Sequence, residues 1–170
     1  TMTIENLQAS YNGDKAARHN MHIAQCIAGM AFSNAILGIV HSMAHKSGKI
    51  FKVPHGCANA IYLPYVIQFN APNAKAKYAE IARRVGLAGK DEQELTDVLI
   101  AKIKQMRVDM QMPATLKEFG LAEGDFKAHL DDVAKTAVQD ACTGTNPREI
   151  DADQMRKLFE AVYYGVEVDF

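Results

Sequence analysis

Apolar residues recur with helical spacing along most of the chain. The clearest case runs from Glu92 to Met110, where one apolar stripe repeats every three or four residues. Its members are Leu95, Val98, Leu99, Ile103, Met106 and Met110. Asp91 followed by Glu94 is typical of a capping box at the start of such a helix. Because no convincing period-2 run occurs, the sequence predicts an all-α fold, a helical bundle.

Three more amphipathic segments predict three further helices. They span roughly Asn73–Val85, Gly124–Asp140 and Asp151–Tyr164. The positions that we expect to be buried are Tyr78, Ile81, Ala82 and Val85 in the first segment, Phe126, Leu130, Val133 and Ala137 in the second, and Met155, Leu158, Phe159 and Val162 in the third. Gly86 and Gly165 follow the first and third segments, and glycine commonly ends a helix in this way.

The segment Met21–Ala44 has a different pattern, because it contains no Lys, Arg, Asp or Glu. A helix that is apolar on nearly every face is normally packed on several sides, so we expect a central helix here. We expect an interruption near Gly38, since glycine costs about 1 kcal/mol relative to alanine inside a helix. A second apolar stretch, Cys57–Phe69, contains Pro64, which predicts a kink or a break.

Composition and charge narrow the class of protein. The 170 residues are 48% hydrophobic and 23% charged, as in ordinary globular domains. A net charge of -1 gives no electrostatic argument for a nucleic acid or an anionic membrane as partner. No run of about 18 uncharged apolar residues predicts a membrane span, and no secretion signal is visible. The three cysteines are an odd number at wide spacing, which favours reduced thiols and a cytoplasmic protein.

Three of the six histidines lie within a short stretch of sequence. His41 and His45 are four residues apart and therefore share one face of a helix, and His55 follows the predicted loop Lys46–Pro54. Imidazole is a common ligand of zinc, iron and copper, so the three residues are candidates for a metal site. The alternative is that they are ordinary hydrogen-bonded histidines. No Asp or Glu lies between positions 14 and 80, so no carboxylate ligand is near them in the sequence.

The other histidines and the cysteines carry weaker signals. We expect the histidines outside this stretch to lie at the surface; they are His19, His22 and His129. Cys26 and Cys57 stand among apolar residues, which predicts burial and a packing role. Cys142 opens a second predicted loop, Cys142–Ile150, from which it can approach a site.

Two motifs together resemble the iron-containing (group III) alcohol dehydrogenases. The first is HSMAH at 41–45 with Gly48, followed by PHGCANA at 54–60, which separates His41 from His55 by fourteen positions. The second is CTGTNPR at 142–148. The resemblance covers nearly the whole chain and is strongest to butanol-dehydrogenase-like enzymes and to the alcohol dehydrogenase half of bifunctional aldehyde–alcohol dehydrogenases. It implies the C-terminal helical domain of the dehydroquinate synthase-like fold.

The resemblance also implies a chemistry and roles for individual residues. In this family Fe(II), or in some members zinc, binds the oxygen of a primary alcohol as a Lewis acid while hydride passes to or from NAD or NADP. Carried over to this sequence, the motifs make His41 and His55 metal ligands. They place His45 beside the metal and the nicotinamide as a proton relay, and Phe32 and Cys142 in the substrate pocket. The partners implied are a small alcohol or aldehyde and further copies of the chain in a homo-oligomer.

Members of this family carry parts that are not found in this sequence. An N-terminal α/β domain holds their dinucleotide, and a D-x-x-x-H motif upstream supplies two more metal ligands; Asp14 does not fit that motif because Arg18 stands at the histidine position. We therefore expect residues 1–170 to form a single, partial metal-binding domain, truncated on its N-terminal side and inactive alone. We also expect it to self-associate through apolar surface on Met21–Ala44. Two alternatives stay open: a non-catalytic helical binding module, and a component of a filament.

Overall fold

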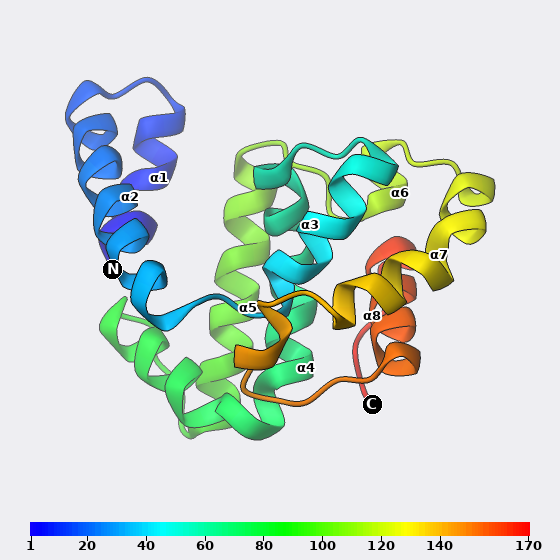
Figure 1. The fold of residues 1–170 in the computed structure, drawn as a ribbon. Coiled ribbons are helices and arrows are strands. Elements are labelled where there is room, and N and C mark those ends of the chain that lie inside the picture. The colour runs from blue at the N-terminus through cyan, green and yellow to red at the C-terminus, as the bar shows by residue number, and fades with distance from the viewer. The chain divides into compact units, whose positions relative to one another are not determined.

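The computed structural model describes all of residues 1–170 and contains helices and loops but no strand, which confirms the all-α prediction. Its elements are α1 (Met2–Tyr11), α2 (Lys15–Ala35), α3 (Ile39–Phe51), α4 (His55–Arg84), α5 (Glu92–Asp109), α6 (Leu116–Phe119), α7 (Glu123–Val138), the 3-10 turn η1 (Thr143–Thr145) and α8 (Ala152–Tyr164) (Figure 1). No single helix is both long and apolar enough to span a membrane; α2 and α3 meet that test only when taken together across the break between them.

The chain forms two compact units. The first unit contains residues 1–36 and 75–111, and the second contains residues 37–74 and 112–170. The long helix α4 contributes its beginning to the second unit and its end to the first. All three clustered histidines and the loop after α7 belong to the second unit. The expectation of a single domain stays a prediction.

The second unit is built around α7, which packs against both α3 and α8 (Figure 1). The apolar positions predicted for α7 and α8 are all buried, which confirms both helical patterns. Aromatic rings fill the centre: Phe126 stacks on Tyr163 with ring centroids 4.2 Å apart, and Phe159 meets Tyr62 edge-on at 5.8 Å. Close packing of this kind gives the loops on its surface a rigid base.

Short sequence signals set the ends of several helices. Asp151 and Gln154 form a capping box at the start of α8, and Gly165 ends that helix with a φ of 74°. At α5 only half of the predicted capping box forms. The Asp91 carboxylate accepts from the N–H of Glu94, but the Glu94 carboxylate accepts from the N–H of Lys90 and not from that of Asp91.

The helix predicted over Asn73–Val85 is not a separate element. Of the kink or break predicted at Pro64, the break does not occur, and the kink stays a prediction. Helix α4 continues for 30 residues through both Pro64 and Pro72. A proline inside a helix removes a hydrogen bond and costs about 3 kcal/mol. The apolar residues on both sides of Pro64 are buried, so packing of α4 in the core compensates for that cost; they are Ile61, Tyr62, Tyr65, Val66 and Phe69.

The interruption predicted near Gly38 is confirmed, since α2 ends at Ala35 and α3 begins at Ile39. Helix α3 is well buried and continues to Phe51, so the loop predicted over Lys46–Pro54 is shorter than expected. Its actual span is 52–54. The extra turns of α3 keep Lys46 on a rigid helix rather than on a loop.

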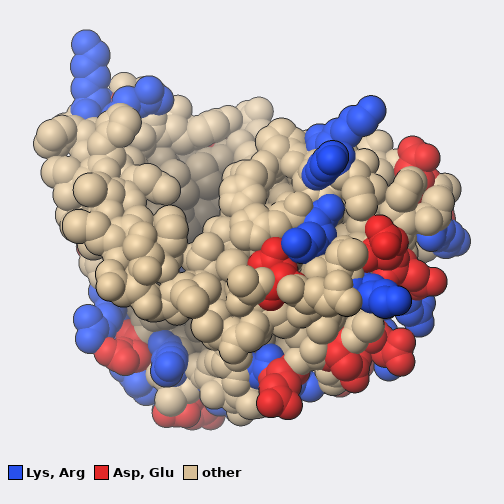
Figure 2. Space-filling view, viewed as in Figure 1, with Lys and Arg blue, Asp and Glu red and all other residues tan.

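The prediction of a buried central helix is wrong for α2. Only Ala17 and Ala24 are buried there, whereas Ile23, Ile27 and Met30 are 39%, 51% and 59% exposed. These three residues follow one another at helical spacing and therefore form one apolar face. On the face of the molecule in Figure 2, the surface over α1 and α2 carries basic side chains only near the turn that joins the two helices.

Candidate functional site

The second unit brings His41, His45 and His55 together. Helix α3 carries His41 and His45 one turn apart, and α4 begins at His55. The ring centroids lie 5.9 Å apart for His41 and His45, 5.3 Å for His41 and His55, and 5.5 Å for His45 and His55. The two helices therefore place all three imidazoles in one cluster.

Asn59 shows how two of these rings are oriented. Its amide nitrogen lies 3.4 Å from Nε2 of His41 and 3.0 Å from Nε2 of His55. An amide nitrogen only donates, so both Nε2 atoms accept and their lone pairs converge on one point. Burial, together with the charges of His55 and His45, lowers the pKa of His41, which keeps its ring neutral. Two imidazoles whose Nε2 atoms are aimed at one point are a donor set that suits a divalent transition metal, as part of a larger ligand set.

A carboxylate that the sequence analysis missed lies on the other side of the cluster. Asp140 follows α7, and its Oδ2 is 3.3 Å from Nδ1 of His45 and 3.1 Å from Nζ of Lys46. Its Oδ1 accepts from the backbone N–H of Cys142 at 3.0 Å. Asp140 is 95 positions from His45 in the sequence, so no local spacing indicates the contact. The one available signal is its place two residues before Cys142.

The surroundings of Asp140 change its acidity. Burial alone would raise its pKa, but hydrogen bonds from the Cys142 N–H, Lys46 and His45 hold the pKa down to about 2. Burial, together with the hydrogen bond to Asp140, raises the pKa of the Cys142 thiol. At neutral pH the group therefore consists of an ionised carboxylate beside a protonated thiol.

The loop 142–148 is tied to α3 by side-chain hydrogen bonds. The hydroxyl of Thr143 donates to Oγ of Ser42 at 2.8 Å, and the hydroxyl of Thr145 donates to the carbonyl oxygen of Leu37. Ser42 lies in the first turn of α3, the helix that carries His41, and Leu37 lies in the link just before it. These bonds hold the second motif against the first.

Asn146 ties the loop 142–148 to the start of α3 and to Asn70 on α4. Its side-chain amide pairs with that of Asn70 through two bonds of 2.7 and 3.0 Å, and its Oδ1 also lies 3.4 Å from the N–H of Ile39. A Cβ at Gly38 would lie 3.0 Å from the same Oδ1. Glycine at position 38 therefore both interrupts the helix and leaves room for Asn146.

The remaining predicted residues have mixed outcomes. Phe32 lies on α2 in the first unit and is 43% exposed, so its role in a substrate pocket stays a prediction. Cys142 is buried beside Asp140, and Cys57 is partly buried. Cys26 is exposed, so the burial predicted for it is wrong; it lies on the unpacked helix α2. His19, His22 and His129 are exposed, as predicted.

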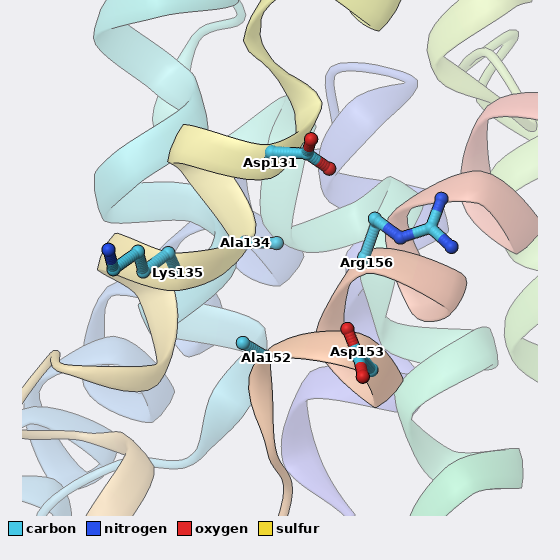
Figure 3. Close-up of a pocket in the computed structure, with 6 residues that line it drawn as sticks. All are labelled: Asp131, Ala134, Lys135, Ala152, Asp153 and Arg156. Carbon is cyan, nitrogen blue, oxygen red and sulfur yellow. The ribbon is translucent and has the colours of Figure 1, made fainter.

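A pocket lies apart from the histidines, between α7 and α8 (Figure 3). It has a volume of about 400 Å³ and is lined by Asp131, Ala134, Lys135, Ala152, Asp153 and Arg156. The two acidic and two basic side chains balance one another, and no imidazole or thiol lines the pocket. The pocket therefore adds no nitrogen or sulfur ligand of the kind found in the histidine cluster.

Comparison with known proteins decides the family. The model described as "Fe-containing alcohol dehydrogenase family, C-terminal" matches residues 1–163. The chain belongs to the iron-containing alcohol dehydrogenase family. It is 57% identical over 169 residues to the NADPH-dependent butanol dehydrogenase of Clostridium saccharobutylicum, which covers 99% of this chain and 44% of that protein. It is 38% identical over 181 residues to the bifunctional aldehyde-alcohol dehydrogenase of Escherichia coli K12, covering 95% of this chain and 20% of that protein.

Solved structures of this family have the same fold. A 1,3-propanediol oxidoreductase matches with a TM-score of 0.88 and 31% identity, over 95% of this chain and 42% of that one. An iron-containing alcohol dehydrogenase from Thermococcus thioreducens matches with a TM-score of 0.82 and 33% identity, over 96% of this chain and 43% of that one. The chain thus spans less than half the length of these relatives and corresponds to the family's C-terminal helical domain. This confirms the resemblance and the fold class that the two motifs imply.

The ion pairs of Asp140 predict a pH-dependent contribution to stability. Its folded-state pKa of about 2 lies below the unfolded value near 3.9, so the stabilisation is complete above about pH 4 and is lost as the pH falls through about 2. Asp140→Asn should therefore lower the free energy of unfolding by about 1–2 kcal/mol at neutral pH, because the partly exposed partners Lys46 and His45 are screened by solvent. Denaturant unfolding at a series of pH values measures this difference, which should shrink between pH 4 and pH 2.

Asp132→Asn is the matched control, because Asp132 is an exposed carboxylate on α7 of the same unit. It should change the free energy of unfolding by less than about 0.5 kcal/mol at every pH. A cost of Asp140→Asn that stays constant down to pH 2 would contradict the assignment.

Proposed function

We propose that this chain is the metal-binding part of an NAD(P)-dependent alcohol dehydrogenase that interconverts a primary alcohol and its aldehyde by hydride transfer. The observation that carries the proposal is the convergence of Nε2 of His41 and Nε2 of His55 on the amide nitrogen of Asn59. Membership of the iron-containing alcohol dehydrogenase family supports it. The similar butanol dehydrogenase indicates a short aliphatic alcohol as the substrate class.

His41 and His55 would hold the metal, Fe(II) or zinc, with further ligands from outside this pair. When bound, such a metal supplies Lewis-acid chemistry at the alcohol oxygen. The chain's own contribution is to aim both imidazoles at one point and to keep His41 neutral, which its lowered pKa favours. We assign NAD or NADP chiefly to a dinucleotide-binding domain that residues 1–170 do not include.

His45 is the residue that we assign to proton transfer. The Asp140 carboxylate accepts from Nδ1–H of His45 at 3.3 Å, which leaves Nε2 of the neutral ring without a proton. A carboxylate that fixes the tautomer of a histidine in this way prepares the opposite ring nitrogen to act as a base. At 39% exposure the ring is also open to solvent, so it can pass the proton on.

The free cysteines fit a reducing cytoplasm as the compartment of this protein.

Domain replacement tests this function directly. In the butanol dehydrogenase of Clostridium saccharobutylicum, the C-terminal segment is exchanged for residues 1–170, which are 57% identical to that enzyme over 169 residues. The chimera should oxidise butan-1-ol with NADP in the presence of Fe(II), because this chain supplies part of the ligand set. His41→Ala or His55→Ala should lower kcat/KM at least about 100-fold, since each removes a metal ligand.

His129→Ala is the control for these variants, since that exposed histidine on α7 bonds only the carbonyl oxygen of Asp125. It should leave kcat/KM unchanged. A chimera that is equally active with and without His55 would overturn the proposal, as would a folded, iron-loaded chimera without activity.

We further propose that the chain self-associates through the apolar face of α2. The face formed by Ile23, Ile27 and Met30 is exposed, and contiguous apolar surface of this kind favours association. This supports the homo-oligomer expected from the sequence. Self-association through this face does not require catalysis. The exposed apolar face of α2 is therefore also the observation that favours a binding or assembly role.

Light scattering of the purified chain at tens of micromolar should show a dimer or a larger species. The double variant Ile27→Glu/Met30→Glu should be monomeric, because it places two charges within the apolar face. Val166→Glu, which changes an exposed residue outside α2, should associate like the unmodified chain. A monomeric unmodified chain would show that the face of α2 does not drive association.

A further inference from the structure

We propose that His45, Asp140 and Cys142 form a metal site of their own, suited to a zinc-class divalent ion and distinct from the pair His41 and His55. One nitrogen, one carboxylate oxygen and one sulfur from these residues all lie within 4.8 Å of one another. The proposal concerns binding alone and does not depend on the dehydrogenase activity proposed above.

The distances fit a small tetrahedral ion. Zinc binds nitrogen and oxygen at about 2.0–2.2 Å and sulfur at about 2.3 Å, which places neighbouring ligand atoms about 3.4–3.6 Å apart. Nδ1 of His45 and Oδ2 of Asp140 are already 3.3 Å apart. Because no pair in the group exceeds 4.8 Å, the Cys142 sulfur has to move by little more than about 1 Å to complete the site.

The donor set selects the class of metal. A thiolate, an imidazole and a carboxylate are together typical ligands of zinc, whereas Mg²⁺ and Ca²⁺ prefer oxygen alone. Three protein ligands leave a fourth tetrahedral position for water. Asp140 is only 10% exposed and Cys142 is buried, but the 39% exposed ring of His45 gives an ion access from solvent.

Lys46 is the competitor for this site. Its ammonium lies 3.1 Å from Oδ2 of Asp140, the same oxygen that contacts His45. An arriving cation has to displace this ammonium, and His45 has to carry its proton on Nε2 instead of Nδ1 so that Nδ1 can bind. The Cys142 thiol has to release its proton to solvent as the metal–sulfur bond forms. Metal binding thus replaces the ion pair of Asp140 with Lys46 by a bond from the Asp140 carboxylate to the metal. Removal of the Lys46 charge should therefore strengthen metal binding.

The two candidate metal sites can be separated by mutation because they share no ligand. His41 and His55 contact the amide of Asn59, whereas His45 contacts the carboxylate of Asp140. Only the second group contains a thiol. A spectroscopic signal from a metal–thiolate bond is therefore specific to the second group.

Titration of the purified chain with Co²⁺, followed by absorption spectroscopy, tests the proposal. Co²⁺ replaces zinc in tetrahedral sites and gives a thiolate-to-cobalt charge-transfer band in the near ultraviolet. The band should appear in the unmodified chain and disappear in Cys142→Ser. It should persist in His41→Ala/His55→Ala, and in Cys57→Ser, which removes the other thiol of the second unit.

Lys46→Met is expected to increase the affinity for Co²⁺. A misfolded variant would lose affinity, so misfolding cannot produce this result. Loss of one positive charge about 3 Å from the ligand oxygen should lower the Kd for Co²⁺ about three- to tenfold. Absence of the band in the unmodified chain, or its loss in Cys57→Ser, would overturn the proposal. Loss of the band in His41→Ala/His55→Ala would show a single shared site and overturn it equally. An unchanged Kd in Lys46→Met would contradict the role of Asp140 as a ligand.

Discussion

Contact between the loop 142–148 and the start of α3 is the constraint on which the candidate site depends. Asn146 reaches the N–H of Ile39 and pairs with Asn70, and the lack of a side chain at Gly38 allows this close approach. Asn70 is buried and Asn146 is partly buried. Amides that satisfy one another in this way define a single arrangement, because leaving a buried amide unpaired costs about 1–3 kcal/mol. Through this contact two motifs that lie far apart in the sequence form one surface.

That contact gives the histidine cluster two sides with different chemistry. On one side the Asn59 amide nitrogen donates to Nε2 of His41 and to Nε2 of His55. On the other side the carboxylate of Asp140, which follows the end of α7, accepts a hydrogen bond from Nδ1 of His45. The first side is suited to bind a metal and the second to fix a tautomer, and α3 contributes one histidine to each, His41 and His45. The packing of α7 against α3 keeps the two sides together.

Much of this architecture follows from local sequence patterns, and the exceptions have physical reasons. The apolar stripes of α5, α7 and α8 predict those helices because burial of one face is encoded locally. The continuity of α4 through Pro64 is not local, since core packing outweighs the cost of the proline. The contact of Asp140 with His45 joins residues 95 positions apart and depends on the tertiary fold. The family motifs contain the three histidines, but Asp140 lies outside them.

The central claim is that the Nε2 lone pairs of His41 and His55 converge on one point. Long-range ¹H–¹⁵N correlation spectra of the histidine rings at mildly alkaline pH test it most directly, because they report which ring nitrogen carries the proton. Single alanine variants assign the signals. Both rings should carry their proton on Nδ1, with Nε2 unprotonated, since the Asn59 amide donates to each Nε2. A proton on Nε2 of either ring would contradict the claim.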